Sequence, residues 1–461
     1  MDQSLKLASV SCNQERSKFE ELPDCILESI VSFLPLRDAM ESSMIFRGLK
    51  HIWLNSIQTR RNLVFDVPNI YGSWRQPRKD DEDFIRRVDQ FLERYPLPRM
   101  GVQELRLPMP TNFGPLYNDD FPHQLLSEQQ VKAVAPLKLK SLSLKGFRLR
   151  VPPEFDGFNQ LTTLCLHSVK VDGIFMSHLF SLGSFLERLT LKNCTWEYFY
   201  SHLNIVSGRL NDFKLISCTE LEKIEISAPN LASLEYIAKS VYPPSSIVFV
   251  NTPKLAKLLY LTDLSTTDPT LLPQTLRQLI PSCPALETLD LQMCAERPQI
   301  GSLPTFGNLK QLNLQIKRGY YNSIPIHLRC VVDLLKVAPL LEELTITIEG
   351  QREFDETDHQ EIRNLDCGFT HNQLKKVKMH GIQGNWYEIE FAIWILKNTT
   401  NLEIMVIDPN WKRYLGDGDY IELNHSTWQK GRHRAVVREK LKEVKTDARI
   451  RILNRWSLPE K

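Results

Sequence analysis

A short apolar frame recurs along most of this chain, and it constrains the fold more than any other feature. In each copy, apolar residues occupy offsets 0, 3 and 5 of a six-residue segment, as in LERLTL from Leu186. Alternation over such a short run is typical of a β-strand that buries one face. The frame starts at Leu139, Leu161, Leu186, Leu210, Leu286, Leu309, Leu341, Leu374 and Leu402.

Most steps between these starts are near 22 to 33 residues, which leaves room for one strand and a return segment in each repeat. This spacing is the pattern of leucine-rich repeats. One coil cannot bury its own leucine face, so neighbouring coils stack into a curved solenoid. Three copies carry a cysteine at offset 8, and we interpret these as small buried hydrophobic residues rather than metal or redox sites: Cys194, Cys218 and Cys294.

Two further segments match the frame at steps of only about ten residues, LEKIEI from Leu221 and LASLEY from Leu231. We expect short, irregular coils there. Between the strands, residues 80–96 and 386–398 show helical periodicity, and RNLVFDV at 61–67 predicts a strand that opens the solenoid. The residues expected on the buried helix faces are Phe84, Val88, Phe91, Leu92, Ile389, Ala392, Ile393 and Leu396.

Composition narrows the class of protein. The chain has 461 residues with 57 basic and 55 acidic side chains, so its net charge of +2 gives no global attraction to nucleic acid or membrane. No apolar run approaches the roughly 18 residues that span a bilayer, and residues 1–18 lack the apolar stretch of a secretory signal. The nine cysteines form no Cys-x-x-Cys pair. We therefore expect no membrane partner, a reducing compartment, and a location in the cytoplasm, the nucleus or both.

The sequence offers little for catalysis. It has no phosphate-binding glycine loop, no Gly-x-Ser-x-Gly elbow and no His-Glu-x-x-His helix. GDGDY from Gly416 predicts a turn rather than a calcium loop, which needs more ligands at alternating positions. Asp358, His359, Cys367 and His371 match no triad or metal spacing, and we interpret them as a polar loop. We expect no catalytic residues, no metal and no cofactor.

The segment FEELPDCILESIVSFLPLRDAM, residues 19–40, is more apolar than a surface helix requires. Pro23 and Pro35 bracket about three helical turns. Around that helix, apolar side chains fill about half of the circumference, which is wider than the stripe needed to cover a single core. The second half of the face must therefore contact something else. The apolar side chains are Leu22, Ile26, Leu27, Ile30, Val31, Phe33 and Leu34.

LPDCILESIVSFLPLRDAM, followed by HIWLN and RNLVFD, resembles the F-box of plant proteins that join an F-box to leucine-rich repeats. The stretch HNQLKKVKMHGIQGNWYEIEFAIWILKNTTNLEIMVIDPN resembles the FBD region that closes many of these chains, and RAVVREKL and ARIRIL fit its final helix and strand. The resemblance implies an α/β chain, α+β overall: a three-helix F-box, a leucine-rich repeat horseshoe and an FBD-like closing region. The expected boundaries are 1–16 (disordered tail), 17–60 (F-box), 61–365 (solenoid), 366–456 (FBD-like region) and 457–461 (tail).

In that family the F-box binds the Skp-type adaptor of a cullin-RING (SCF) ubiquitin ligase, and the repeats hold the protein to be ubiquitinated. The resemblance therefore implies a non-catalytic substrate-recognition subunit, whose partners are the adaptor, through it a cullin, and a protein substrate. Residues carried over as adaptor-facing or supporting are Leu22, Pro23, Ile26, Leu27, Ile30, Leu34, Pro35, Leu36, Arg37, Asp38 and Trp53.

Two alternatives remain beside this interpretation. In IFRGLKHIW, Leu49 stands where relatives commonly carry an aromatic residue and Gly48 lies inside the expected third helix, so the chain could be a binding scaffold that recruits no ligase. Residues 430–451 hold nine Lys and Arg against three acidic residues, which suggests a nucleic-acid binder. The apolar stripe of Val437, Leu441 and Val444 favours a solvated helix at the end of the array instead.

Charges on the concave side of the solenoid provide the candidate substrate site. Residues at offsets 2, 4 and 6 of each frame alternate away from the leucines. We expect a face that is basic at both ends and acidic between, and an acidic substrate segment on the early basic strip. The early residues are Lys145, His167, Arg188, Lys192 and Lys214; the middle ones are Glu225, Glu235 and Asp290, and the late ones are Lys376, Lys378 and His380.

Overall fold

The computed structural model divides into two compact units, Met1–Leu186 (unit 1) and Glu187–Lys461 (unit 2). The expected tails at 1–16 and 457–461 lie outside the described residues, as do Asp358, His359 and Cys367. The structure describes residues 22–45, 47–72, 81–95, 97, 100–109, 120–126, 138–152, 155, 157–172, 175–176, 179–180, 185–197, 201–238, 246–262, 271–294, 303–317, 329–349, 368–423 and 432–453.

The described part of unit 1 begins with three packed helices, α2 (Asp24–Phe33), α3 (Leu36–Ile45) and α4 (Arg47–Thr59). Pro23 lies at the start of α2, and its carbonyl accepts the first helical hydrogen bonds. Pro35 separates α2 from α3, because its ring cannot continue the hydrogen-bond ladder of α2. The side chains of Ile52, Trp53 and Ile57 on α4 are fully buried, so α4 supplies much of the core of this bundle.

A parallel sheet follows in unit 1, with strand order β1-β2-β3-β5. As expected, β1 (Asn62–Val64) opens this sheet and pairs with β2. Helix α6 packs as its periodicity predicts, with Phe84, Val88 and Leu92 buried. The elements that complete this part are α5 (Val67–Tyr71), α6 (Asp81–Arg94), β2 (Glu104–Pro108), η2 (His123–Leu126), β3 (Ser141–Lys145), β4 (Arg148–Leu149), β5 (Thr163–His167) and β6 (Lys170–Val171).

Ten parallel strands form the main sheet of unit 2, and the order along the sheet equals the order along the chain. Each strand buries its leucine positions, as with Leu289, Leu312 and Leu344 in register on three neighbours. The repeats therefore stack as the frame predicts. The strands are β7 (Arg188–Lys192), β10 (Asp212–Ile216), β12 (Ser233–Ala238), β14 (Lys257–Thr262), β15 (Thr288–Cys294), β16 (Gln311–Lys317), β17 (Glu343–Glu349), β18 (Lys376–His380), β19 (Ile404–Asp408) and β22 (Arg449–Ile452).

A second sheet of three strands shows that the expectation for Leu221 was wrong. β9 (Ser201–Val206), β11 (Leu221–Ser227) and β13 (Ser246–Asn251) pair with one another and form their own sheet. LEKIEI is therefore a return strand of a normal coil rather than a short coil of its own. Its Glu225 consequently does not lie on the concave face of the main sheet, and it pairs instead with Lys223 at 3.0 Å.

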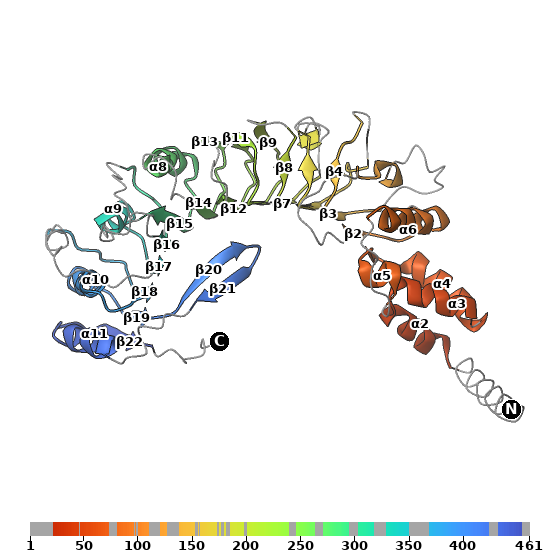
Figure 1. Ribbon diagram of the computed structural model, residues 1–461. Helices are drawn as coiled ribbons and strands as arrows, with labels where there is room; N and C mark the ends of the chain where they lie inside the picture. Colours follow the sequence, from red (N-terminus) through yellow and green to blue (C-terminus); the bar gives the residue numbers. More distant parts are fainter. Residues whose placement is uncertain are drawn as a thin grey trace, which may run out of the picture. The chain divides into compact units, whose positions relative to one another are not determined.

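Figure 1 shows the helices of unit 2 on the outer side of the main sheet, with an antiparallel hairpin on the opposite side. The helices are α8 (Leu271–Ser282), α9 (Arg329–Val337), α10 (Trp386–Lys397) and α11 (Arg432–Lys442). The hairpin consists of β20 (Trp411–Gly416) and β21 (Asp419–Leu423), joined at the predicted GDGDY turn. None of the helices in the described ranges is long and apolar enough to cross a membrane.

Candidate protein-binding surfaces

Helix α2 has two apolar faces, which explains its wide apolar arc. Leu27 and Val31 are buried against the other helices of the bundle. Ile26, Ile30 and Phe33, spaced at i, i+4 and i+7, lie roughly 100° further around the helix, where Ile26 is 45% exposed and Phe33 is 87% exposed. Burying Phe33 would remove a large apolar area from water. This outer side of α2 is therefore a candidate protein-binding surface.

The other two helices also expose large apolar side chains, with Met44 at 64% and Ile45 at 63% on α3 and Leu54 at 39% on α4. We call Ile26, Phe33, Met44, Ile45 and Leu54 together the N-terminal apolar residues. The sequence did not predict the exposure of Met44 and Ile45. The residues carried over on that helix, Leu36, Arg37 and Asp38, all lie at its start.

Burial separates the supporting residues from the exposed ones in the set carried over as adaptor-facing or supporting. Leu27, Leu36 and Trp53 are at most 3% exposed, so they support the helix bundle and cannot contact a partner directly. Trp53 also donates an indole hydrogen bond of 3.0 Å to the hydroxyl of Tyr95. The remaining residues of that set are exposed or partly exposed: Leu22, Pro23, Ile26, Ile30, Leu34, Pro35, Arg37 and Asp38.

Arg37 and Asp38 at the start of α3 are held by local contacts. The Arg37 guanidinium pairs with Glu41 at 2.7 Å, one turn further along the helix. Gly72 has a φ of +86°, and a Cβ at that position would lie 2.6 Å from the Asp38 carboxylate. Only glycine permits this close approach. As expected, Gly48 lies within α4, where Leu49 is buried.

The candidate substrate residues fall in both units. In unit 1, Lys145 and His167 are register partners on β3 and β5. In unit 2, Arg188 is exposed at the start of β7, while Lys192 and Lys214 are partly buried. The structure thus places the two lysines on adjacent strands, but it does not leave them open to solvent as the sequence rule suggested.

The tip of the β20–β21 hairpin covers these two lysines. The Lys214 ammonium lies 2.6 Å from the carboxylate of Asp417, and Lys192 lies 3.4 Å from that of Asp419. The backbone N–H of Asp417 also donates to Glu235 at 2.8 Å. Burial lowers the pKa of Lys214, but Asp417 and the nearby carboxylates outweigh it and raise the pKa overall.

Further along the concave face, the predicted charges are arranged in ion pairs and hydrogen bonds. Burial raises the pKa of Asp290 to about 6, although Asn313 donates a hydrogen bond of 2.9 Å to its carboxylate. Lys376 pairs with Glu343 at 3.2 Å. His380 contacts Asp408 at 3.2 Å. The late end of the face is therefore less basic than its lysines and histidine alone suggested.

His371 corrects the expected polar loop, because it is buried between two repeats. Its Nε2 donates to the carbonyl of Ala338 at 3.0 Å, while its Nδ1 accepts from the backbone N–H groups of Gln373 and Leu374. Burial lowers the pKa of the ring, which favours its neutral form. Cys194 and Cys218 are buried as predicted, and burial raises the pKa of Cys218.

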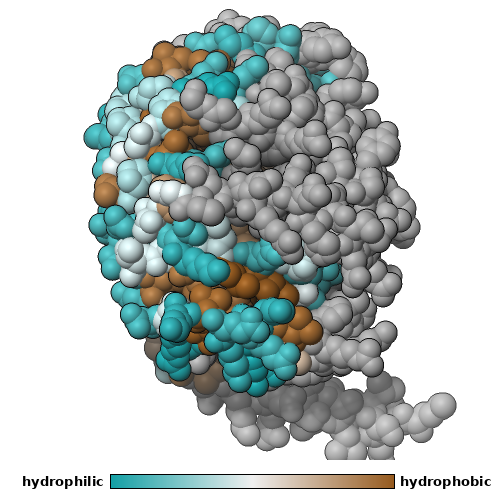
Figure 2. Space-filling model, turned by 90° about the vertical axis from the view of Figure 1, so that its left-hand side faces the viewer, coloured by the Kyte–Doolittle hydropathy of each residue, from teal (hydrophilic) through white to brown (hydrophobic). Residues whose placement is uncertain are grey.

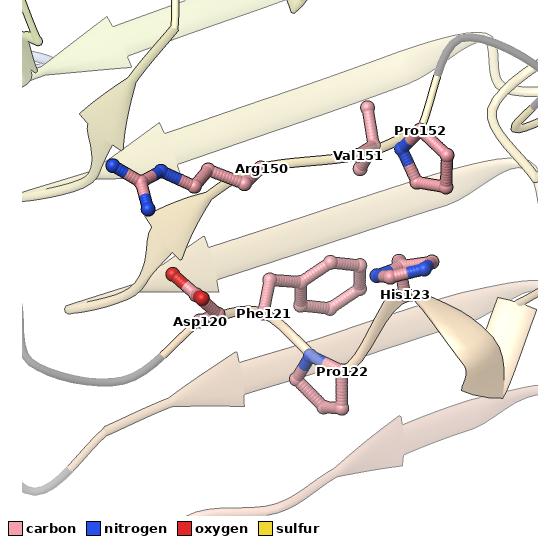
Figure 3. Close-up of a pocket in the computed structure, with 7 residues that line it drawn as sticks. All are labelled: Asp120, Phe121, Pro122, His123, Arg150, Val151 and Pro152. Carbon is pink, nitrogen blue, oxygen red and sulfur yellow. The ribbon is translucent and has the colours of Figure 1, made fainter.

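A shallow pocket of about 560 Å³ lies in unit 1 beside η2. Figure 3 shows Asp120 and Arg150 at one end, with the ring of Phe121 directed towards His123 at the other. Pro122, Val151 and Pro152 complete its lining. No nucleophile and base are paired among these seven residues. Within the described ranges, no group of three or more His, Cys, Asp or Glu could hold a metal ion.

The helical side of unit 2 carries both hydrophobic and basic residues at its surface. Figure 2 shows hydrophilic residues around a hydrophobic area in the lower half of the view. The basic helix α11 buries Val437 and Leu441, while Arg438, Lys440 and Lys442 are exposed. The apolar stripe therefore packs within unit 2, and the basic side chains face solvent. This arrangement is the one expected for a solvated helix at the end of the array.

Comparison with known proteins identifies the family. A family model described as the leucine-rich repeat domain of At1g61320/AtMIF1 matches residues 75–447. The chain belongs to this plant family of F-box, leucine-rich repeat and FBD proteins. This membership agrees with the stacked parallel strands of unit 2.

Two curated relatives from Arabidopsis thaliana span most of the chain. The putative F-box/FBD/LRR-repeat protein At4g03220 is 25% identical, covering 83% of this chain and 86% of that protein. The putative FBD-associated F-box protein At1g61330 is 24% identical, covering 86% of this chain and 92% of that protein. A third, the putative FBD-associated F-box protein At5g44940, is 31% identical over 80 residues.

Proposed function

We propose that this chain is a substrate-recognition subunit of an SCF-type ubiquitin ligase. Helices α2, α3 and α4 would form an F-box that binds a Skp-type adaptor and through it a cullin. The concave face of the repeats would hold the protein to be ubiquitinated. The chain would perform no chemistry itself, since holding a substrate near the ligase raises the rate of transfer through proximity.

The exposed second face of α2 is the observation that carries this proposal. A helix whose inner face already packs in the bundle gains nothing from Phe33 and Ile26 on its outer face unless a partner covers them. The names of the relatives place an F-box in proteins of this family. The resemblance of residues 19–40 to an F-box supports assigning that F-box to these helices.

The energetics are compatible with a stable complex. Burying one large apolar side chain contributes about 1.5–3 kcal/mol. Four of the N-terminal apolar residues, Ile26, Phe33, Met44 and Ile45, are 45%, 87%, 64% and 63% exposed, so covering them would contribute roughly 4–8 kcal/mol before the costs of association. Association and side-chain ordering consume several kcal/mol of that gain. The affinity would therefore depend on most of these residues being covered together.

A titration with a purified Skp-type adaptor tests the proposal. Phe33→Glu places a charge on the outer face of α2, where burial would leave it without a partner. We expect at least a tenfold loss of affinity, which corresponds to about 1.4 kcal/mol. Because Phe33 is almost fully exposed, the fold and the melting temperature should not change.

Leu340→Glu provides the matched control. Leu340 is also an exposed apolar residue, at 45%, but it lies in unit 2 away from the three helices in the chain. The adaptor should bind this variant as it binds the unmodified chain. If the unmodified chain itself shows no affinity for the adaptor, the chain is a leucine-rich repeat scaffold that recruits no ligase.

A further inference from the structure

The β20–β21 hairpin occupies the part of the concave face where the sequence predicts a binding surface. Its tip contributes two carboxylates that neutralise two lysines of the sheet, through the pairs Lys214–Asp417 and Lys192–Asp419. Further from the tip, Arg413 forms a 2.8 Å ion pair with Glu349 on β17. The hairpin therefore contacts strands that are far apart in the unit 2 sheet, from β7 and β10 to β17.

An apolar strip lies beside the two lysines and is covered by the same hairpin. Ile216, Ile237 and Leu261 are register partners on β10, β12 and β14, and all three point to the concave side yet are buried. Tyr414 of the hairpin packs against them. A Cβ at Gly416 would lie 2.9 Å from Ile216 and 3.1 Å from Ile237, so the hairpin approaches as closely as glycine permits.

Side-chain contacts are the main link between the hairpin and the sheet. Among the strands that the structure describes, β20 and β21 pair with each other and form a separate two-stranded sheet. At the tip of the hairpin, the backbone N–H of Asp417 donates a hydrogen bond to the side chain of Glu235 in the main sheet. A lone two-stranded hairpin is marginally stable in water. Moving it away would therefore leave every strand pair of the main sheet intact.

We propose that the hairpin is an internal ligand of this concave surface, and that a protein segment with an acidic turn beside an aromatic residue binds there in its place. This inference rests on the part of the proposed function that assigns substrate binding to the concave face, and it specifies the chemistry of the substrate segment. The hairpin itself supplies the template. Its carboxylates match Lys192 and Lys214, its aromatic ring matches the apolar strip, and its small turn matches the space at Gly416.

This arrangement regulates the surface by competition within the molecule. The hairpin is tethered beside its site, so its effective concentration is high and it excludes weak partners. The apparent affinity of an external segment is reduced by the fraction of molecules in which the surface is free. A partner must match the site better than the hairpin does. The competition therefore excludes acidic segments that match only the two lysines.

Two glycines give a matched pair of variants for the test. Gly416 and Gly418 have φ of +102° and +86°, so an alanine strains the backbone at both positions. A Cβ at Gly416 collides with the apolar strip, whereas a Cβ at Gly418 meets nothing within 4 Å. Gly416→Ala should therefore displace the hairpin, and Gly418→Ala should leave it seated.

The probe is a synthetic peptide of residues 411–423, closed into a ring by a disulfide between cysteines added at its two ends. We expect Gly416→Ala to bind this peptide at least tenfold more tightly than the unmodified chain and Gly418→Ala to resemble the unmodified chain. Hydrogen exchange should show faster exchange in 411–423 of Gly416→Ala alone. A peptide with asparagine in place of both aspartates should bind weakly.

A second variant tests the same displacement without strain in the backbone. Asp417→Asn with Asp419→Asn removes the tip charges without changing shape, and it should also free the surface for the unmodified peptide. The proposal is overturned if the hairpin is released but no peptide binds, if neither variant releases it, or if the asparagine peptide binds equally well. Adaptor titrations on the same variants separate this result from the proposed function, because the F-box test involves no hairpin residue.

Discussion

Asp290 shows how a single residue of the concave face departs from ordinary surface chemistry. It lies on β15 at a position that the alternation rule correctly assigns to the concave side. Burial nevertheless raises the pKa of its carboxyl group to about 6, and the hydrogen bond from Asn313 offsets only part of that effect. The sequence predicts the side on which this residue lies, but it cannot predict burial, which depends on neighbours from other repeats.

Asp290→Asn should therefore stabilise the protein at neutral pH. The folded-state pKa lies above the unfolded one, so the cost appears as pH rises from about 4 to 6 and is fully present above that range. Each pKa unit corresponds to 1.36 kcal/mol, and partial exposure reduces the full value, so we expect a gain of about 2 kcal/mol at pH 7.5. Denaturant titrations at pH 7.5 and pH 4 measure it. An equal gain at both values would contradict this origin.

Helix α10 shows what periodicity can and cannot predict for one element. Its apolar positions predict a helix over residues 386–398, and the helix spans Trp386–Lys397 with Ile389, Ala392 and Leu396 buried and Ile393 partly buried. They do not reveal that Glu388 is buried too. Its carboxylate accepts hydrogen bonds of 2.9, 2.9 and 3.0 Å from the backbone N–H groups of Gln383, Gly384 and Asn385. This single side chain therefore fixes where the helix begins.

Glu388→Ala should destabilise unit 2 more than Glu388→Gln. Alanine leaves three backbone donors without their acceptor, at about 1 kcal/mol each, so we expect a loss of about 3 kcal/mol. Glutamine keeps one acceptor oxygen and removes a buried charge, so its loss should be smaller. Chemical denaturation of the three proteins at pH 7 gives the order. Equal losses would mean that the negative charge, rather than the accepting oxygen, holds the turn.

At the scale of the whole molecule, the sequence predicts the repeated strands and misses contacts between residues far apart in the chain. The leucine frame predicts most strands of the main sheet, although β2 and β14 were not among the copies recognised in the sequence. It fails at Leu221, because a return strand inside a coil also points its apolar residues inward and so shows the same spacing. The hairpin contact joins Lys214 to Asp417, which are 203 residues apart. The clue to that contact was apolar Ile216, Ile237 and Leu261 at offsets where solvated residues were expected.

Stacked repeats also predict how the molecule loses structure. Each repeat of a solenoid contacts mainly its neighbours, so a core defect should loosen nearby strands first. Leu312→Ala on β16 and Leu164→Ala on β5 remove equally buried leucines from unit 2 and unit 1. Such changes cost about 3 kcal/mol, or about a hundredfold in local opening.

Hydrogen exchange under native conditions tests this expectation with each variant as the control of the other. Leu312→Ala should accelerate exchange in β15, β16 and β17 and leave β3 and β5 unchanged, whereas Leu164→Ala should accelerate β3 and β5 and leave β15 to β17 unchanged. The reason is that the lost packing energy is confined to strands that share the cavity. Equal acceleration of both regions by either variant would show that the two units open as one cooperative block.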